Sequence, residues 1–196
     1  NHEKQEIESE QVSLFFRDGL IISFQEAETD LFNSVRDRLM TGNGRIRQRG
    51  SDYLAYALID TLVDNYYLLL DDIELNIDLL EERIIHNPDK SIKTNIHHLK
   101  KELLVSRKSI SPLREAISRF SKSESKYIND ESKLFIRDLY DHTVQVLDMV
   151  ESYRDTINGL QDLYLSEISF KMNQVMQILT IISVIFVPLT FLAGIY

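Results

Sequence analysis

The stretch that decides the fold is ILTIISVIFVPLTFLAGIY, at residues 178–196. The last charged residue before it is Lys171, so residues 172–196 form an uncharged run of 25 positions. A helix that crosses a bilayer needs roughly 20 apolar residues, whereas a run of about 10–14 is more typical of a buried core helix. We therefore expect residues 172–196 to form a membrane-spanning helix rather than the core of a soluble domain.

The rest of the chain is acidic and rich in charge. The 196 residues carry a formal net charge of −9, and 27% of them are charged. A nucleic-acid binder needs Lys and Arg to neutralise phosphates, so this balance argues against one. The absence of cysteine excludes disulfides and thiolate chemistry. With only 6 Gly and 3 Pro, the composition favours long, uninterrupted helices. Because the first residue is Asn, we expect a fragment of a longer protein.

The N-terminal part, residues 1–27, contains a predicted β-hairpin. In QVSLFFRDGLIISFQE, residues 11–26, apolar and other residues alternate on either side of an Asp-Gly turn at Asp18 and Gly19. A lone hairpin is marginally stable in water. We therefore expect the hairpin either to be the last piece of a larger sheet that lies upstream or to pack on the helices.

Residues 28–127 are predicted to form a helical region. Apolar residues recur every three or four positions over 51–86, and residues 51–82 hold nine acids and no Lys or Arg. After a turn at 86–91, residues 90–108 hold six bases against one acid. Opposite charge on consecutive helices predicts an antiparallel hairpin with complementary faces. Pro112 is expected to kink its second helix.

A long stalk helix, residues 128–171, is predicted to run directly into the span. From a cap at Asn129 or Asp130 to Pro188, only Gly159 interrupts the helical pattern, which gives about 58 residues and ~87 Å at 1.5 Å per residue. A heptad stripe follows the stalk. Packing of this stripe against the helix hairpin is favoured, and self-association is the alternative. Its members are Thr143, Val146, Val150, Tyr153, Ile157, Leu160 and Tyr164.

A second stripe runs through the span and collects polar or small residues. Such residues in a span face protein or water rather than lipid, so close helix packing and a water-filled path are both open. One helix cannot enclose a pore, but a ring of copies can. Neutral oxygens can hold the waters of a hydrated divalent cation, and Met176 with Leu179 can form an apolar constriction. The stripe comprises Asn173, Met176, Thr180, Ser183, Val187, Thr190 and Gly194.

The sequence resembles the CorA family of magnesium transporters. The resemblance rests on LTIISVIFVPLTFLAGIY, which is similar to the family's first membrane helix, and on segments 137–166, 51–74 and 9–16. It implies that the chain stops just before the family's Gly-Met-Asn signature. It also implies a mainly α fold with a remnant β-hairpin, which is α+β in the full protein, and it makes residues 1–27 the C-terminal hairpin of a cytosolic α/β domain. The implied pore positions are Asn173, Met176, Leu179, Val187, Thr190 and Gly194.

The resemblance further implies a homopentameric channel in the inner or plasma membrane, with most of this fragment in the cytosol. Mg²⁺ would be both the transported ion, with Co²⁺ or Ni²⁺ also possible, and a regulator sensed between subunits. Asp138 matches a sensing carboxylate whose partner lies upstream, and Asp162 matches a second acid on the stalk. Without the family, Asp138 and His142 are only a surface pair four residues apart.

Three alternatives to this function were weighed from the sequence. Zinc transporters of the same superfamily share the architecture, so the ion is left open. A membrane-anchored coiled-coil protein fits the heptad stripe, but it gives no reason for polar residues on one face of the span. An enzyme is not expected, because no nucleophile elbow, phosphate loop or metal-ligand cluster is present.

Overall fold

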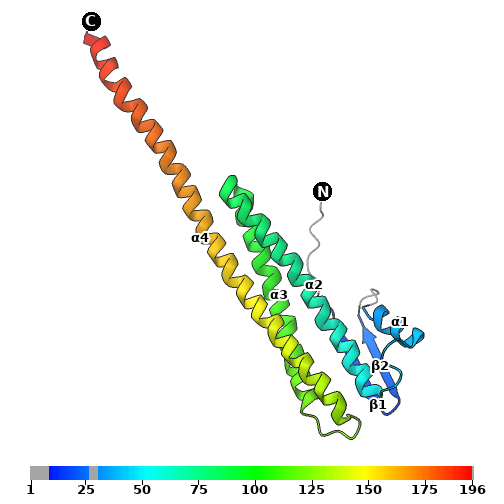
Figure 1. Cartoon of the computed structure of the whole chain (residues 1–196). Coiled ribbons are helices and arrows are strands. Elements are labelled where there is room, and N and C mark those ends of the chain that lie inside the picture. The colour runs from blue at the N-terminus through cyan, green and yellow to red at the C-terminus, as the bar shows by residue number, and fades with distance from the viewer. Residues whose placement is uncertain (1–8, 27–30, 196) are drawn as a thin grey trace.

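The computed structural model describes residues 9–26 and 31–195. The chain is mainly helical, and three long helices lie side by side (Figure 1). One of them, α4, extends far beyond the other two and ends at the C-terminus (Figure 1). The elements in order are β1 (Val12–Arg17), β2 (Leu20–Gln25), α1 (Asn33–Thr41), α2 (Ser51–His86), α3 (Lys90–Ser121) and α4 (Asp130–Ile195).

The predicted hairpin is confirmed. β1 and β2 pair antiparallel in a register that places Arg17 opposite Leu20, and Gly19 adopts a φ of +68° in the turn, which favours glycine. One face of the hairpin packs on α1 and the start of α2. The other face leaves Phe15 and Phe24 exposed, with their rings edge to face at 6.1 Å. The expectations for residues 1–8 and 27 lie outside the described residues.

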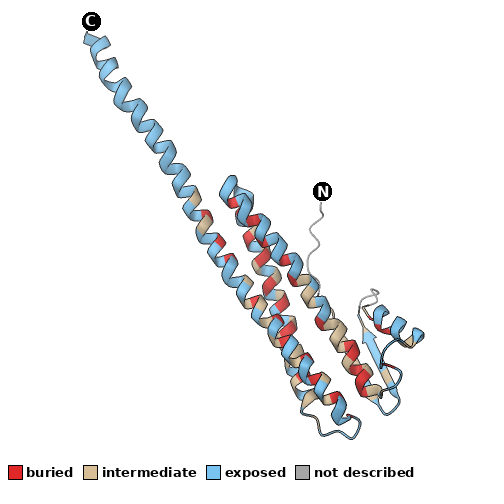
Figure 2. Ribbon diagram, in the orientation of Figure 1, coloured by how far each residue is buried: buried red, intermediate tan, exposed pale blue. Residues whose placement is uncertain are grey.

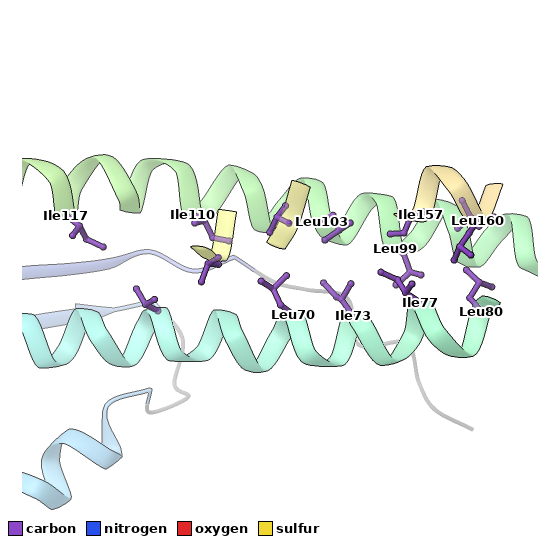
Figure 3. Packing of buried hydrophobic residues seen from close by; sticks show 14 of the residues in the cluster. Leu70, Ile73, Ile77, Leu80, Leu99, Leu103, Ile110, Ile117, Ile157 and Leu160 are labelled. Carbon is purple, nitrogen blue, oxygen red and sulfur yellow. The ribbon is translucent and has the colours of Figure 1, made fainter. Parts of the chain in front are cut away.

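The core of the molecule is an apolar seam between α2, α3 and α4. Figure 3 shows side chains from the three helices meeting in layers, with Ile77 of α2, Leu99 of α3 and Ile157 of α4 close together. Ile157 is 0% exposed. The stalk stripe from Thr143 to Tyr164 lies largely in this seam, so the prediction that it packs against the helix hairpin is confirmed.

The antiparallel arrangement of α2 and α3 is confirmed, but the predicted reason for it is wrong. The contact between them is apolar, and two bases of α3 pair with α4 instead. Lys100 Nζ donates to Gln161 Oε1 at 2.7 Å, and Arg107 pairs with Glu151 at 3.1 Å. Burial of apolar side chains, worth roughly 1.5–3 kcal/mol each, therefore joins the hairpin more strongly than charge does.

The starts of α2 and α4 meet at one joint. Asp52, only 1% exposed, accepts the backbone N–H of Asn129 at 2.8 Å and so ties the start of α2 to the start of α4. Beside it, the Arg49 guanidinium lies 5.2 Å from the ring centre of Tyr53 and 5.0 Å from that of Phe135. The first turns of α2 and α4 are therefore held together by both hydrogen bonding and cation–π contact.

α4 is one continuous helix of 66 residues. It passes through Gly159 without a break. It also continues beyond Pro188, whereas the helical pattern in the sequence was followed only as far as that proline. Proline removes one backbone hydrogen bond, which a membrane-spanning helix can tolerate. No described residue from Leu165 to Ile195 is buried, and Figure 2 shows this end exposed apart from one half-buried position, Glu167. Among the described helices, α4 has the length and composition to cross a membrane.

Candidate pore helix and metal site

All predicted pore residues lie on the projecting end of α4. They are exposed, with Met176, Leu179 and Val187 between 59% and 65% accessible. Within the described residues, therefore, no other part of the chain packs against this surface. A pore built from these side chains is incomplete in one copy, and lipid or other protein must cover the apolar remainder.

Two threonine hydroxyls of the second stripe donate their hydrogens to their own helix. Thr180 donates to the carbonyl oxygen of Met176 at 2.8 Å, and Thr190 donates to that of Phe186 at 3.0 Å. A hydroxyl has one donor and two acceptor lone pairs, so these oxygens are left as acceptors toward the outside. The stripe thereby offers hydrogen-bond acceptors on the face where charge is absent.

The stripe is a slowly winding line rather than a straight one. Steps of three and four residues drift by about 20° per heptad on a straight helix. Leu179 directly precedes Thr180 and is turned about 100° from it, so it lies beside the stripe. The band from Met176 to Thr180 therefore presents both apolar and hydroxyl surface at nearly the same level.

Asp138 lies exposed on α4, on the side that faces α2. Its charge contributes to raising the pKa of Tyr56, after the larger effects of burial and of the neighbouring Asp60. The Tyr56 hydroxyl donates to Asp60 Oδ2 at 3.3 Å. Burial, and then the charge of Asp64, raise the pKa of Asp60. The structure thus places an acid of α2, missed in the sequence, on the same face as Asp138.

His142 belongs to this face as well. Its backbone carbonyl accepts the Tyr67 hydroxyl at 3.2 Å, and its ring charge opposes the rise in the pKa of Asp60. Within the described ranges, no three His, Asp or Glu side chains stand close enough to hold a metal ion. Asp60, Asp138 and His142 therefore form a charged surface that needs further ligands to bind an ion tightly.

Asp162 is not brought to this surface. It is exposed and lies 24 residues after Asp138 on the same unbroken helix. At 1.5 Å per residue the two carboxylates are about 36 Å apart along the axis. They cannot ligate one ion, so the two predicted metal residues mark separate positions on the stalk.

Comparison with known proteins agrees with this architecture. A family model described as CorA-like Mg²⁺ transporter protein matches residues 1–196. The cobalt/magnesium transport protein CorA of Thermotoga maritima is 48% identical over 191 residues, which covers 97% of this chain and 54% of that protein. The putative metal ion transporter YfjQ of Bacillus subtilis is 34% identical over 193 residues, covering 98% of this chain and 60% of that protein. The chain thus spans little more than half the length of these relatives.

A solved structure shares the fold. The complete structure of the CorA magnesium transporter from Methanocaldococcus jannaschii aligns with a TM-score of 0.77 at 24% identity, over 93% of this chain and 58% of that chain. The likeness includes the arrangement of long helices described above. Because the family model matches from the first residue to the last, the chain belongs to the family of CorA-like Mg²⁺ transporter proteins.

Proposed function

We propose that this chain supplies the stalk and first span of a divalent cation transport protein. The observation that carries the proposal is the exposed, uncharged end of α4 with acceptor oxygens along one face. A helix that only anchors a protein in lipid does not need a face of this kind. The name of the Thermotoga relative, a cobalt/magnesium transport protein, supports the same ion class.

The permeating species is a hydrated Mg²⁺ ion, with Co²⁺ or Ni²⁺ as possible substitutes. Mg²⁺ gives up its waters reluctantly, so a path that holds the hydrated ion avoids that cost. The waters around a cation point their hydrogens outward, where Thr180 and Thr190 offer oxygen acceptors. A ring of carboxylates would bind the ion too tightly for it to leave easily. Met176 and Leu179 form the apolar constriction.

The pore is enclosed by copies of this chain. We propose a homopentamer in which each copy turns the same stripe of α4 toward the central axis. α4 crosses the inner or plasma membrane from about Met172 onward, and the three-helix bundle lies in the cytosol. The eight positions proposed to line the pore are Asn173, Met176, Leu179, Thr180, Ser183, Val187, Thr190 and Gly194.

Cytosolic Mg²⁺ regulates this ring through the face that carries Asp138. Asp60 and Asp138 supply part of a site that a neighbouring copy or an upstream residue completes. When Mg²⁺ occupies the site, it bridges carboxylates and holds the ring closed. When the site empties, the like charges repel and the open state gains population, because the ligand binds one state better. Asp162 is a second, separate cation position nearer the membrane.

Ion flux into lipid vesicles tests the transport proposal. The intact protein that carries this sequence is reconstituted, and entry of Mg²⁺ is followed with an enclosed fluorescent indicator. Asn173→Leu and Thr190→Val should each lower the flux, because they remove oxygen acceptors from the path. Phe191→Leu is the matched control, since Phe191 adjoins Thr190 but lies off the stripe.

Flux at the wild-type level in both stripe variants would count against a pore lined by this face and favour a membrane anchor. Parallel assays with Co²⁺, Ni²⁺ and Zn²⁺ identify the ion. Uptake of Zn²⁺ but not of Mg²⁺ would support the proposed pore and show that Zn²⁺ is the transported ion.

A further inference from the structure

α2 carries a row of acids on the side of the bundle where it borders α4. Asp64, Asp71 and Asp78 repeat every seven residues and are exposed, and we call them the acidic flank. The neighbouring Tyr153 of α4 donates its hydroxyl to Glu74 Oε2 at 2.8 Å. Burial and this bond to Glu74 raise the pKa of Tyr153 to about 12, with smaller contributions from Asp71 and Asp78. The acidic flank therefore runs along the junction of α2 with α4.

α3 carries a matching row of bases, which borders α4 on its other side. Lys93, Lys100 and Arg107 also repeat every seven residues, and we call them the basic flank. Lys100 and Arg107 contact Gln161 and Glu151 of α4, as described above. Because Glu151 and Tyr153 are two residues apart, they point about 200° apart around α4. The two flanks therefore lie on different sides of α4.

The two rows lie at interleaved levels along the bundle. The side chains of Tyr66 and Ser109 are hydrogen-bonded near the middle of the α2–α3 pair, and Arg83 donates to Ser91 at 2.7 Å near the end where the two helices are joined. In an antiparallel pair, a step of one residue toward the C-terminus of α2 is matched by a step of one residue toward the N-terminus of α3. Lys100 therefore lies level with Leu75, midway between two acids of the acidic flank. Arg107 lies level with Leu68 and is likewise between two acids.

We propose that the acidic flank of one copy docks on the basic flank of the next copy. This inference rests on the proposed ring and names the surface through which cytosolic neighbours recognise each other. Rotation about an axis parallel to α4 leaves the height of every residue along that axis unchanged. Each base of one copy therefore meets the gap between two acids of its neighbour. Two different surfaces on one subunit give a head-to-tail contact, which closes into a ring when the rotation between neighbours is that of the proposed pentamer.

Exposed leucines strengthen the same contact. Leu68 and Leu75 on α2 are 67% and 57% exposed, and Leu104 on α3 is 51% exposed. Their positions in the helical repeat place them at the margins of the two flanks. Docking removes their apolar surface from water, while the charged rows set the register and exclude a copy approaching in the wrong orientation.

Disulfide trapping tests the docking directly, because the chain contains no cysteine. His97 lies level with Asp78 and between Lys93 and Lys100 on α3. The chain carrying both Asp78→Cys and His97→Cys is oxidised in lipid vesicles. A head-to-tail contact should give a series of covalent oligomers, whereas either single variant should form no covalent link between copies. The control pair is Asn76→Cys with His97→Cys, because Asn76 is exposed on the opposite side of α2.

Charge reversal gives a second, independent readout in the double-cysteine protein. Lys100→Glu should lower the covalent yield roughly fivefold, which is the scale of one exposed ion pair. Adding Asp71→Lys should restore the yield, since opposite charges then meet again across the contact. Raising the salt from 0.1 M to 1 M should also lower the yield, because the screening length shortens from about 10 Å to 3 Å.

A separate cysteine in the span distinguishes failure of the docking from failure of the ring. Ser183→Cys lies on the stripe proposed to face the pore, where identical residues converge. Covalent dimers through Ser183→Cys, without covalent oligomers through the 78–97 pair, would overturn the docking and leave the ring intact. No oligomers by either route would overturn both. A dimer from Asp78→Cys alone would overturn the head-to-tail contact in favour of a symmetric one.

Discussion

Replacing Asp52 with alanine should loosen the joint at which α2 and α4 begin. The carboxylate is 1% exposed and accepts the backbone N–H of Asn129 at 2.8 Å. Hydrogen bonds to charged groups contribute about 1.5–3 kcal/mol, and a negative charge in the first turn of a helix adds about 0.3–1 kcal/mol. Asp52→Ala should therefore cost roughly 2–4 kcal/mol of the free energy of unfolding.

Thermal unfolding of the chain in detergent micelles, followed by circular dichroism at 222 nm, measures this cost. For a chain of this size, 1 kcal/mol shifts Tm by about 2–4 °C, so Asp52→Ala should lower Tm by roughly 4–16 °C. Asp52→Asn keeps an acceptor oxygen and should lower it less. Asp37→Ala removes an exposed acid of α1 and serves as the control. If Asp52→Ala melts with the control and hydrogen exchange at Asn129 is unchanged, the bridge does not stabilise the joint.

Four further outcomes are expected. Ile157→Ala should cost about 2–5 kcal/mol in the same melting assay, because its side chain is 0% exposed among three helices. Gly159→Ala should raise the melting temperature slightly, since an added methyl group meets no atom within 4 Å and helix propensity improves. Because folding raises the pKa of Tyr153 to about 12 from 10.0, stability should fall as pH rises between these values, and fall less in Tyr153→Phe. In the assembled, intact protein, Asp138→Ala should remove the protection that Mg²⁺ gives against protease, whereas protection equal to that of an Asp141→Ala control would exclude Asp138 from the sensor.

Local patterns in the sequence were sufficient for the long elements. The three-to-four spacing of apolar residues predicted a helix over 51–86, which is the extent of α2. The heptad stripe predicted which face of α4 is buried, because that face is defined by its own residues. The uncharged run likewise predicted from its own residues that the end of α4 lies outside the core of the bundle.

Contacts between distant segments were beyond those patterns. Nine acids lie in residues 51–82, and only the rotation and height of α2 against α4 decide that Asp60 and Asp138 both act on Tyr56. The Asp52 bridge joins residues 77 positions apart, for which no local spacing exists. The opposite charges of α2 and α3 suggested a direct pairing, but apolar burial filled that contact and left the charges at its sides.

The continuity of α4 has a mechanical consequence. One helix is clamped in the bundle as far as Tyr164 and then runs free for another 31 residues to Ile195, about 46 Å at 1.5 Å per residue. The helix therefore behaves as a lever, with one arm held by α2 and α3 and the other arm projecting beyond them. A tilt of about 5° at the grip displaces the far end by roughly 4 Å, which exceeds the width of a water molecule of about 1.4 Å radius. Small rotations within the bundle are therefore amplified along the rod without any change inside the membrane segment itself.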